Sequence, residues 1–226
     1  MGDPLYMKYP DLSLAQSVFS LASPSTSSAA KKTSLQSLQD AIKEHKMAPL
    51  YHYLAHPQTG KLNTPGEGTS SSTNSPPALL RRTSSINTSS IIGVLGGVKS
   101  TNGVHLPWDE QLYDELKKDN EKELETIQKE EDDAVESAGE TEIQTARGKR
   151  AEFYARICDK DAALSAFEAL MEKTGILGSK IDIVLAIIRI GLFFDDKLLV
   201  KKSIERCSTL VESGGDWVCC QQYWQA

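Results

Sequence analysis

The sequence predicts an all-α protein, an antiparallel helical array of tetratricopeptide-like repeats (an α-solenoid fragment) with a disordered insert. Across residues 141–217 the apolar residues recur at the three- and four-residue spacing of amphipathic helices. Ala155-Arg156-Ile157 is echoed 33 residues later by Ile188-Arg189-Ile190, and tetratricopeptide repeats have a period of about 34 residues. Short polar breaks predict four consecutive helices in this array, and they lie at Asp159-Lys160, Gly175 to Gly178 and Asp195-Asp196.

Residues 1–56 are expected to contain three short helices. Asp11 is a suitable N-cap for the first, because its carboxylate can accept a hydrogen bond from the first turn. A Ser-rich break separates the first helix from the second, and Met47-Ala48-Pro49 ends the second. The expected helices cover residues 12–22, about 33–46 and 50–54.

Residues 57–104 have a different composition, dominated by Ser, Thr, Pro, Gly and Asn and without aromatic residues. Such a segment buries too little apolar surface to offset the entropy of ordering it, so we predict that it is a disordered insert. Two origins stay open, a lineage-specific loop and translated non-coding sequence.

A regulatory pattern lies within this insert. Arg81-Arg82 directly precede Thr83, Ser84 and Ser85, and kinases that prefer basic substrates act on such hydroxyl groups. A phosphate there would shift a locally basic patch towards negative charge. These three residues are therefore candidate phosphorylation sites.

Residues 105–140 are expected to form one long acidic helix that begins near Trp108. Between residues 109 and 142 there are fifteen acidic residues and four lysines, so this region carries more negative charge than the whole chain's net −6. Leu112, Leu116 and Leu124 provide only a narrow apolar stripe. Two interpretations are open, a solvated face and a helix that docks on a basic partner.

The composition excludes several classes of protein. A net charge of −6 and a pI near 5.3 argue against nucleic-acid binding, which needs a basic face. The most apolar run, residues 181–194, contains Asp182 and Arg189 and is too short to span about 30 Å of hydrocarbon. Four cysteines without disulfide-type spacing indicate reduced thiols in the cytosol or nucleus.

A resemblance to a known family covers the array and parts of the N-terminal region. Pro10-Asp11-Leu12 and Met47-Ala48-Pro49 match the beginning of the family sequence. Further short matching segments follow in the same order along the array. The chain resembles the N-terminal helical region of the non-ATPase regulatory subunit 6 family of the proteasome lid. The matching words in the array are Lys149 to Tyr154, Arg156-Ile157, Asp159-Lys160, Ala163-Leu164, Ala166-Phe167, Asp182-Ile183-Val184, Arg189 to Phe193 and Gly214-Gly215-Asp216-Trp217.

The resemblance implies a non-catalytic scaffold of the 26S proteasome regulatory particle lid, found in the cytoplasm and nucleus. Its partners would be other lid and regulatory-particle subunits in a hetero-oligomer, with no nucleic acid and no membrane. The family continues into a C-terminal assembly module called the PCI domain, whereas residues 218–226 depart from the family pattern and are interpreted as an aberrant tail. The related first subunit of the signalosome, which acts on cullins, is the alternative; Met47-Ala48-Pro49 and Gly214-Gly215-Asp216-Trp217 favour the proteasome.

Four residues are candidates for packing against partner subunits. Trp108 and Trp217 are the apolar anchors expected to supply binding energy, and Arg189 and Asp216 are charged groups that would select the partner. Phe193 is assigned to the core instead.

No catalytic, metal-binding or cofactor-binding residue is expected. His52 and His56 have a spacing that can hold a metal on one helix face, but a third ligand is not evident and both are expected to be ordinary surface histidines. Gly93, Gly96 and Gly97 lack the Gly-Lys-Ser/Thr ending of a phosphate-binding loop.

Overall fold

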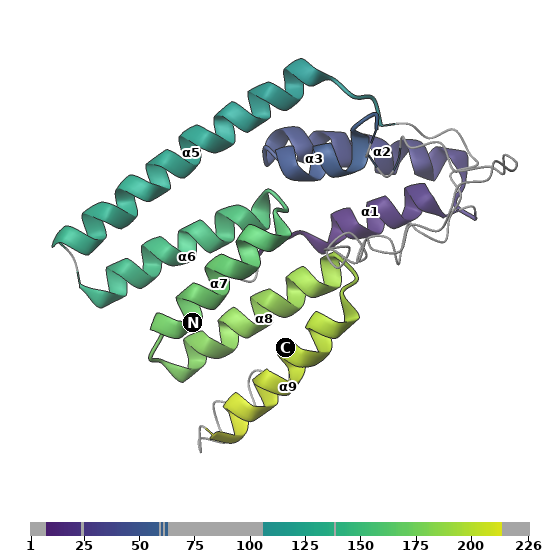
Figure 1. Cartoon of the computed structure of the whole chain (residues 1–226). Helices are drawn as coiled ribbons and strands as arrows, with labels where there is room; N and C mark the ends of the chain where they lie inside the picture. The colour runs from purple at the N-terminus through teal and green to yellow at the C-terminus, as the bar shows by residue number, and fades with distance from the viewer. Residues whose placement is uncertain are drawn as a thin grey trace, which may run out of the picture.

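The computed structural model describes residues 8–58 except 24, residues 60 and 62, and residues 106–213 except 138. All the regular elements in these residues are α-helices, which confirms the predicted all-α class (Figure 1). The helices are α1 (Leu12–Ala22), α2 (Ser28–Glu44), α3 (Ala48–Ala55), α5 (Glu110–Ser137), α6 (Glu140–Arg156), α7 (Lys160–Lys173), α8 (Leu177–Phe193) and α9 (Lys197–Ser213).

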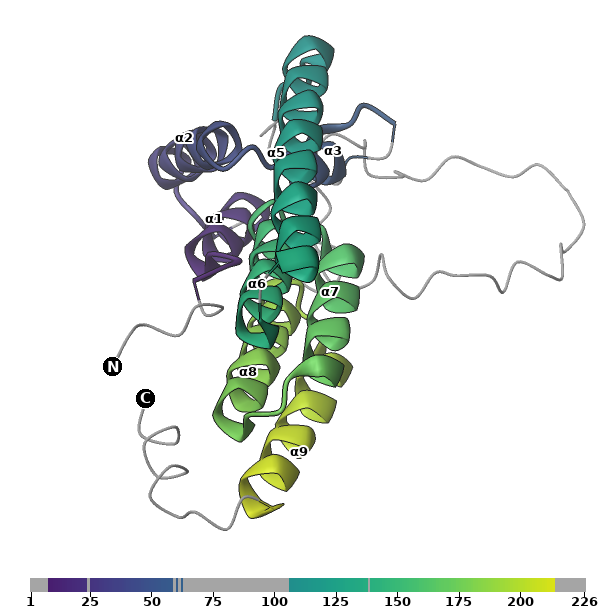
Figure 2. The ribbon, with the colours of Figure 1, turned by 90° about the vertical axis from the view of Figure 1, so that its left-hand side faces the viewer.

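Helices α5 to α9 follow one another side by side, each packed on the next; α6 to α9 are the four helices predicted for the array, and the acidic helix α5 adds a fifth. Two of the N-terminal helices lie against this array: α1 contacts α8, and α3 contacts α5, while α2 packs on α1 and α3. Figure 2 shows α1 and α2 projecting to one side of the stack. No helix among the described residues combines the length and the apolar character needed to cross a bilayer.

Side-chain caps explain where several helices begin. Asp11 Oδ1 accepts a hydrogen bond from the Ser13 N–H at 2.9 Å, and α1 has the bounds expected from the sequence. Helix α2 starts earlier than expected, at Ser28 instead of residue 33, because the Ser27 hydroxyl caps it by accepting from the Ala30 N–H at 3.3 Å. The Ser-rich stretch therefore contains a helix start as well as a break.

Helices α2, α6 and α8 end with the same backbone motif. A residue in the left-handed region follows each C-cap, and the next N–H bonds to the carbonyl five residues earlier, which is the Schellman arrangement. Glycine is usual at this position, so its absence hides the motif in the sequence. The left-handed residues are Lys46 (φ 55°), Cys158 (φ 62°) and Asp195 (φ 52°).

The structural repeat is longer than the sequence echo indicates. Helix α6 ends at Arg156 and α8 ends at Phe193, which is 37 residues later. The N-caps Asp159 of α7 and Asp196 of α9 keep the same 37-residue separation. The 33-residue echo of Ala155-Arg156-Ile157 therefore does not mark the repeat, because it aligns residues at different positions along their helices.

One hydrophobic cluster runs through the N-terminal helices and the array. The α8 helix is central to it, and Phe193 is 6% exposed, as the core assignment predicted. Gly191 lets α9 approach closely, since a Cβ atom there would lie 2.8 Å from Val200 Cγ2. Fully buried side chains of this cluster include Leu38, Ile42, Leu54, Phe167, Leu170, Ile183, Ile187 and Ile190.

Part of the acidic charge of α5 is neutralised inside the molecule. Glu123 lies 2.5 Å from Arg156 of α6, and Glu130 lies 2.7 Å from Lys149. Each distance joins a carboxylate oxygen to a basic nitrogen. The acidic helix thus meets a basic face of its own chain along α6, and only its outer face is solvated.

Candidate interaction surfaces

Trp108 precedes α5 and holds it against α3. Its ring stacks on Tyr51, with ring centroids 5.0 Å apart and planes inclined by 17°, and it also contacts Tyr113 at 5.2 Å. The Tyr51 hydroxyl donates to the Pro107 carbonyl and accepts from the Asp109 N–H, both at 2.7 Å. Trp108 is therefore half-buried and packs within the molecule, although its remaining surface stays available to a partner.

His52 and His56 are partly exposed, and their rings belong to the same aromatic cluster. Their ring centroids are 4.5 Å apart, and each ring also meets Trp108 edge-on, at 5.9 Å and 5.2 Å. Burial, and then the neighbouring His56, lowers the pKa of His52. The described residues contain no group of three side chains that could hold a metal.

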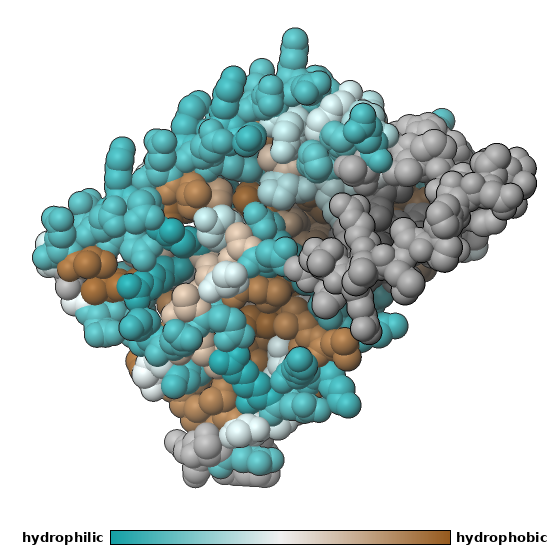
Figure 3. All heavy atoms as spheres, in the orientation of Figure 1, coloured by the Kyte–Doolittle hydropathy of each residue, from teal (hydrophilic) through white to brown (hydrophobic). Residues whose placement is uncertain are grey.

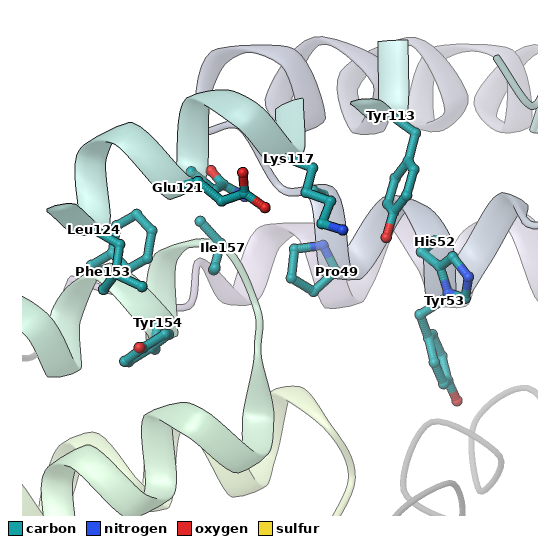
Figure 4. Close-up of a pocket in the computed structure, with 12 residues that line it drawn as sticks. Pro49, His52, Tyr53, Tyr113, Lys117, Glu121, Leu124, Phe153, Tyr154 and Ile157 are labelled. Carbon is teal, nitrogen blue, oxygen red and sulfur yellow. The ribbon is translucent and has the colours of Figure 1, made fainter. Parts of the chain in front are cut away.

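A groove lies where α3, α5 and the end of α6 meet, next to this cluster (Figure 4). It encloses about 430 Å³ and its walls are mostly aromatic or aliphatic. Lys117 and Glu121 are exposed on its α5 side. The apolar walls are formed by Pro49, Tyr113, Leu124, Phe153, Tyr154 and Ile157.

Two residues that line this groove each have a buried polar atom without a hydrogen-bond partner in the described structure. These atoms are the Tyr53 hydroxyl oxygen and Asn120 Oδ1. Burial raises the pKa of Tyr53 to about 12, and Asn120 is only 8% exposed. Sequence reasoning missed Asn120, although its position is informative: it lies four residues after Leu116 and four before Leu124, within the apolar stripe of α5.

The candidate partner residue Arg189 makes a contact within the chain. Its Nε donates to the Pro10 carbonyl at 2.9 Å, so it ties the segment before α1 to α8. Its role in partner selection stays a prediction. The other candidates lie outside the described residues; these are Asp216, Trp217 and the phosphorylation candidates Thr83, Ser84 and Ser85.

A second groove lies between α1 and α8 and encloses about 380 Å³. Phe19 and Leu192 line it and are 48% and 53% exposed. Leu198, just after the α8–α9 turn, is 74% exposed, and Ile176 before α8 is 68% exposed. Figure 3 shows apolar surface exposed between polar patches over the lower helices of the array. Periodicity did not reveal these residues, because they lie beside the buried stripes of their helices.

Cys158 does not act as a nucleophile in this conformation. It is buried, and burial followed by the charge of Asp11 raises its pKa, so the thiol stays protonated at neutral pH. In the adjacent pair Asp195-Asp196, Asp196 stabilises two helix starts. Its Oδ2 lies 2.8 Å from Lys160 Nζ, and its Oδ1 accepts a hydrogen bond from the Leu199 N–H.

The amino-acid sequence of this chain is similar to those of known proteins. Residues 109–224 match the family described as 26S proteasome subunit RPN7. The 26S proteasome non-ATPase regulatory subunit 6 of Caenorhabditis elegans is 31% identical over 210 residues, which cover 93% of this chain and 40% of that protein. The 26S proteasome regulatory subunit RPN7 of Saccharomyces cerevisiae is 31% identical over 222 residues, which cover 95% of this chain and 44% of that protein.

A third relative, the non-ATPase regulatory subunit 6 of Dictyostelium discoideum, is 43% identical over 114 residues, or 50% of this chain and 30% of that protein. The chain thus spans less than half the length of these relatives. The resemblance noted in the sequence is confirmed, and the chain belongs to the RPN7 family of 26S proteasome regulatory subunits.

Proposed function

We propose that this chain is a non-catalytic scaffold subunit of the 26S proteasome regulatory particle lid, and that it supports ubiquitin-dependent degradation by packing its helices against neighbouring subunits. It would work in the cytoplasm and nucleus as part of a hetero-oligomer, without nucleic acid or membrane as a partner. The family supports membership of the regulatory complex, and the surface of the array supports the mode of action.

The observation that carries this proposal is the exposed apolar corner formed by Phe19, Leu192 and Leu198. Phe19 and Leu192 line one groove, and Leu198 follows Leu192 across the α8–α9 turn. Scattered apolar side chains are normal on a protein surface, but a leucine that is 74% exposed six residues after a leucine that lines an apolar groove is typical of a contact site. Buried apolar anchors supply most of the affinity in such interfaces.

The test is co-purification of the epitope-tagged full chain from cells that contain the 26S proteasome, followed by identification of the bound proteins. We expect lid and ATPase-ring subunits to sediment with the tagged chain. The variant Leu198→Asp should reduce their recovery, whereas Val135→Asp, at a side chain 55% exposed on α5, should leave it unchanged. Recovery of signalosome subunits and cullins would favour the alternative, and sedimentation only as a free monomer would refute both.

A further inference from the structure

We propose that the groove between α3, α5 and the end of α6 binds a protein segment that carries an arginine beside an apolar residue. The inference concerns a different groove from the one between α1 and α8, and it does not depend on assembly into the lid. Figure 4 shows side chains from all three helices around this hollow.

The first observation is an unmet hydrogen bond. Asn120 is 92% buried, it lines the groove, and its Oδ1 has no partner among the described residues. A buried polar atom without a partner is costly, and native structures contain few of them. Tyr53 also lines the groove, but its hydroxyl points away from the hollow in Figure 4, so Asn120 is the group that bears on a ligand. A ligand that brings N–H donors into the groove would supply the partner that Asn120 Oδ1 lacks.

The second observation is the shape and chemistry of the walls. A volume of about 430 Å³ is large enough for one or two side chains of a partner, and the half-buried rings of Tyr113 and Tyr154 line it. Aromatic faces attract a guanidinium group, and aliphatic walls such as Leu124 suit an apolar neighbour. Figure 3 shows apolar surface between the hydrophilic helix α5 and helix α6.

The third observation is charge. Glu121 lines the groove, and Asp114 and Glu125 lie two turns before it and one turn after it on the same side of α5. All three are exposed and none forms an ion pair within the described part of the chain. Lys117 also lines the groove, and the exposed Lys118 lies one turn from both Asp114 and Glu121, so the three carboxylates exceed the two lysines by a single negative charge along this edge. This potential favours a basic segment and disfavours an acidic one.

Arginine meets these three conditions together. It has five N–H donors, its planar group stacks on aromatic rings, and it pairs with carboxylates. Lysine supplies the charge without the flat stacking surface. A second copy of this chain, or a small apolar molecule, would fill the groove without matching its charge.

The test measures binding of fluorescein-labelled peptides to the isolated 226-residue chain by fluorescence anisotropy, in physiological salt. One peptide repeats Arg and Leu along one helix face, and its match has Glu in place of each Arg. We expect the Arg peptide to bind at least about ten-fold more tightly than the Glu peptide. Equal binding of the two, or no binding of the Arg peptide, would overturn the proposal.

Charge-reversal variants locate the site. Glu121→Lys should weaken binding of the Arg peptide by about five-fold or more, because it places a like charge at the groove. Glu136→Lys is the matched control, since Glu136 is an exposed carboxylate on the same helix. It lies roughly 22 Å further along the axis, beyond a Debye length of about 8 Å. Equal effects of the two variants would show non-specific attraction and contradict the assignment.

Asn120→Leu separates a binding role from a structural one. Replacing an unsatisfied buried amide by an apolar group of similar size should raise the melting temperature of the free chain and weaken peptide binding several-fold. A raised melting temperature with unchanged affinity would assign Asn120 to the core alone and refute its part in the site. Light scattering completes the test: a dimer that Glu121→Lys dissociates would identify a second copy as the occupant instead. Failure of these peptide measurements would leave the co-purification result, and hence the proposed function, untouched.

Discussion

Asp196 joins the starts of two helices of the array, and its replacement is a sharp test of how the array is held together. Its Oδ1 caps α9 by accepting from the Leu199 N–H at 3.0 Å, and its Oδ2 lies 2.8 Å from Lys160 Nζ at the first residue of α7. The Lys160 and Asp196 side chains are only 11% and 25% exposed, so water screens this ion pair weakly.

The magnitude follows from the two roles of the carboxylate. Loss of an N-cap costs about 0.5–2 kcal/mol, and loss of a hydrogen bond to a charged group costs about 1.5–3 kcal/mol. We therefore expect Asp196→Ala to lower the free energy of unfolding by about 2–5 kcal/mol. Asp196→Asn keeps an oxygen acceptor for the cap and loses only the charge. We expect it to lower the free energy of unfolding by about 1–2 kcal/mol.

The pH dependence of this loss has a definite sign. Burial acts to raise the pKa of Asp196, but the hydrogen bond from Lys160 and the backbone bonds of the cap outweigh it, and the pKa is lowered from 3.8. A carboxylate whose pKa is lowered on folding contributes its full stabilisation above the unfolded value and loses it as the pH falls through the folded value. The difference between the native chain and Asp196→Asn should therefore be constant from neutral pH to about pH 5 and shrink below 3.8.

The assay is urea unfolding followed by far-ultraviolet circular dichroism across this pH range. Glu212→Gln is a suitable control, because it removes an exposed carboxylate from the same helix, and its effect should stay within about 0.5 kcal/mol. The reasoning would be refuted if Asp196→Ala lowered the free energy of unfolding by less than the control Glu212→Gln does. The reasoning would also be refuted if the difference in the free energy of unfolding between Asp196→Asn and the native chain grew as the pH falls.

Three further predictions concern the buried Phe167, the close approach at Gly191 and the buried hydroxyl of Tyr53. Phe167→Ala, at a side chain with 0% exposure, should lower the free energy of unfolding by about 3–5 kcal/mol in the same urea assay, whereas the exposed Leu198→Ala should change it by less than about 0.5 kcal/mol. Gly191→Val should cost at least about 1–3 kcal/mol because its Cβ would lie 2.8 Å from Val200 Cγ2, and Val200→Ala in the same chain should recover part of this loss. Burial raises the pKa of Tyr53 from 10.0 to about 12, so this phenol ionises at lower pH in the unfolded chain than in the folded one. The free energy of unfolding should therefore fall as the pH rises above 10. Tyr53→Phe should reduce that fall and remove one phenol from the spectrophotometric titration.

Local sequence signals predicted the helices well where they involve only neighbouring residues. Asp11 and the apolar spacing that follows it predicted α1 with its observed bounds, and the polar breaks predicted the four helices from α6 to α9. The start of α2 was missed because Ser27, within a Ser-rich stretch, proved to be a cap. The 33-residue echo was misleading because three matching residues can recur by chance, whereas the ends of α6 and α8 lie 37 residues apart.

The candidate surfaces were less predictable, since they depend on which residues face one another across helices. Trp108 was recognised as a packing residue, but its stacking on Tyr51 requires the chain on either side of residues 57–104 to come together. Arg189 was expected to select a partner, yet it reaches the Pro10 carbonyl, 179 positions earlier in the chain.

The sequence by itself determined that this chain is a stack of amphipathic helices of the RPN7 family, because helical periodicity, helix caps and the segments that match the family are properties of short stretches of sequence. Only the tertiary structure decided that α5 pairs with the basic face of α6, that Asp196 joins α7 to α9, and that Asn120 is buried without a partner at the meeting point of three helices. The physical reason is that burial, ion pairing and hydrogen-bond satisfaction depend on distances between residues far apart in the chain, which a one-dimensional pattern does not contain.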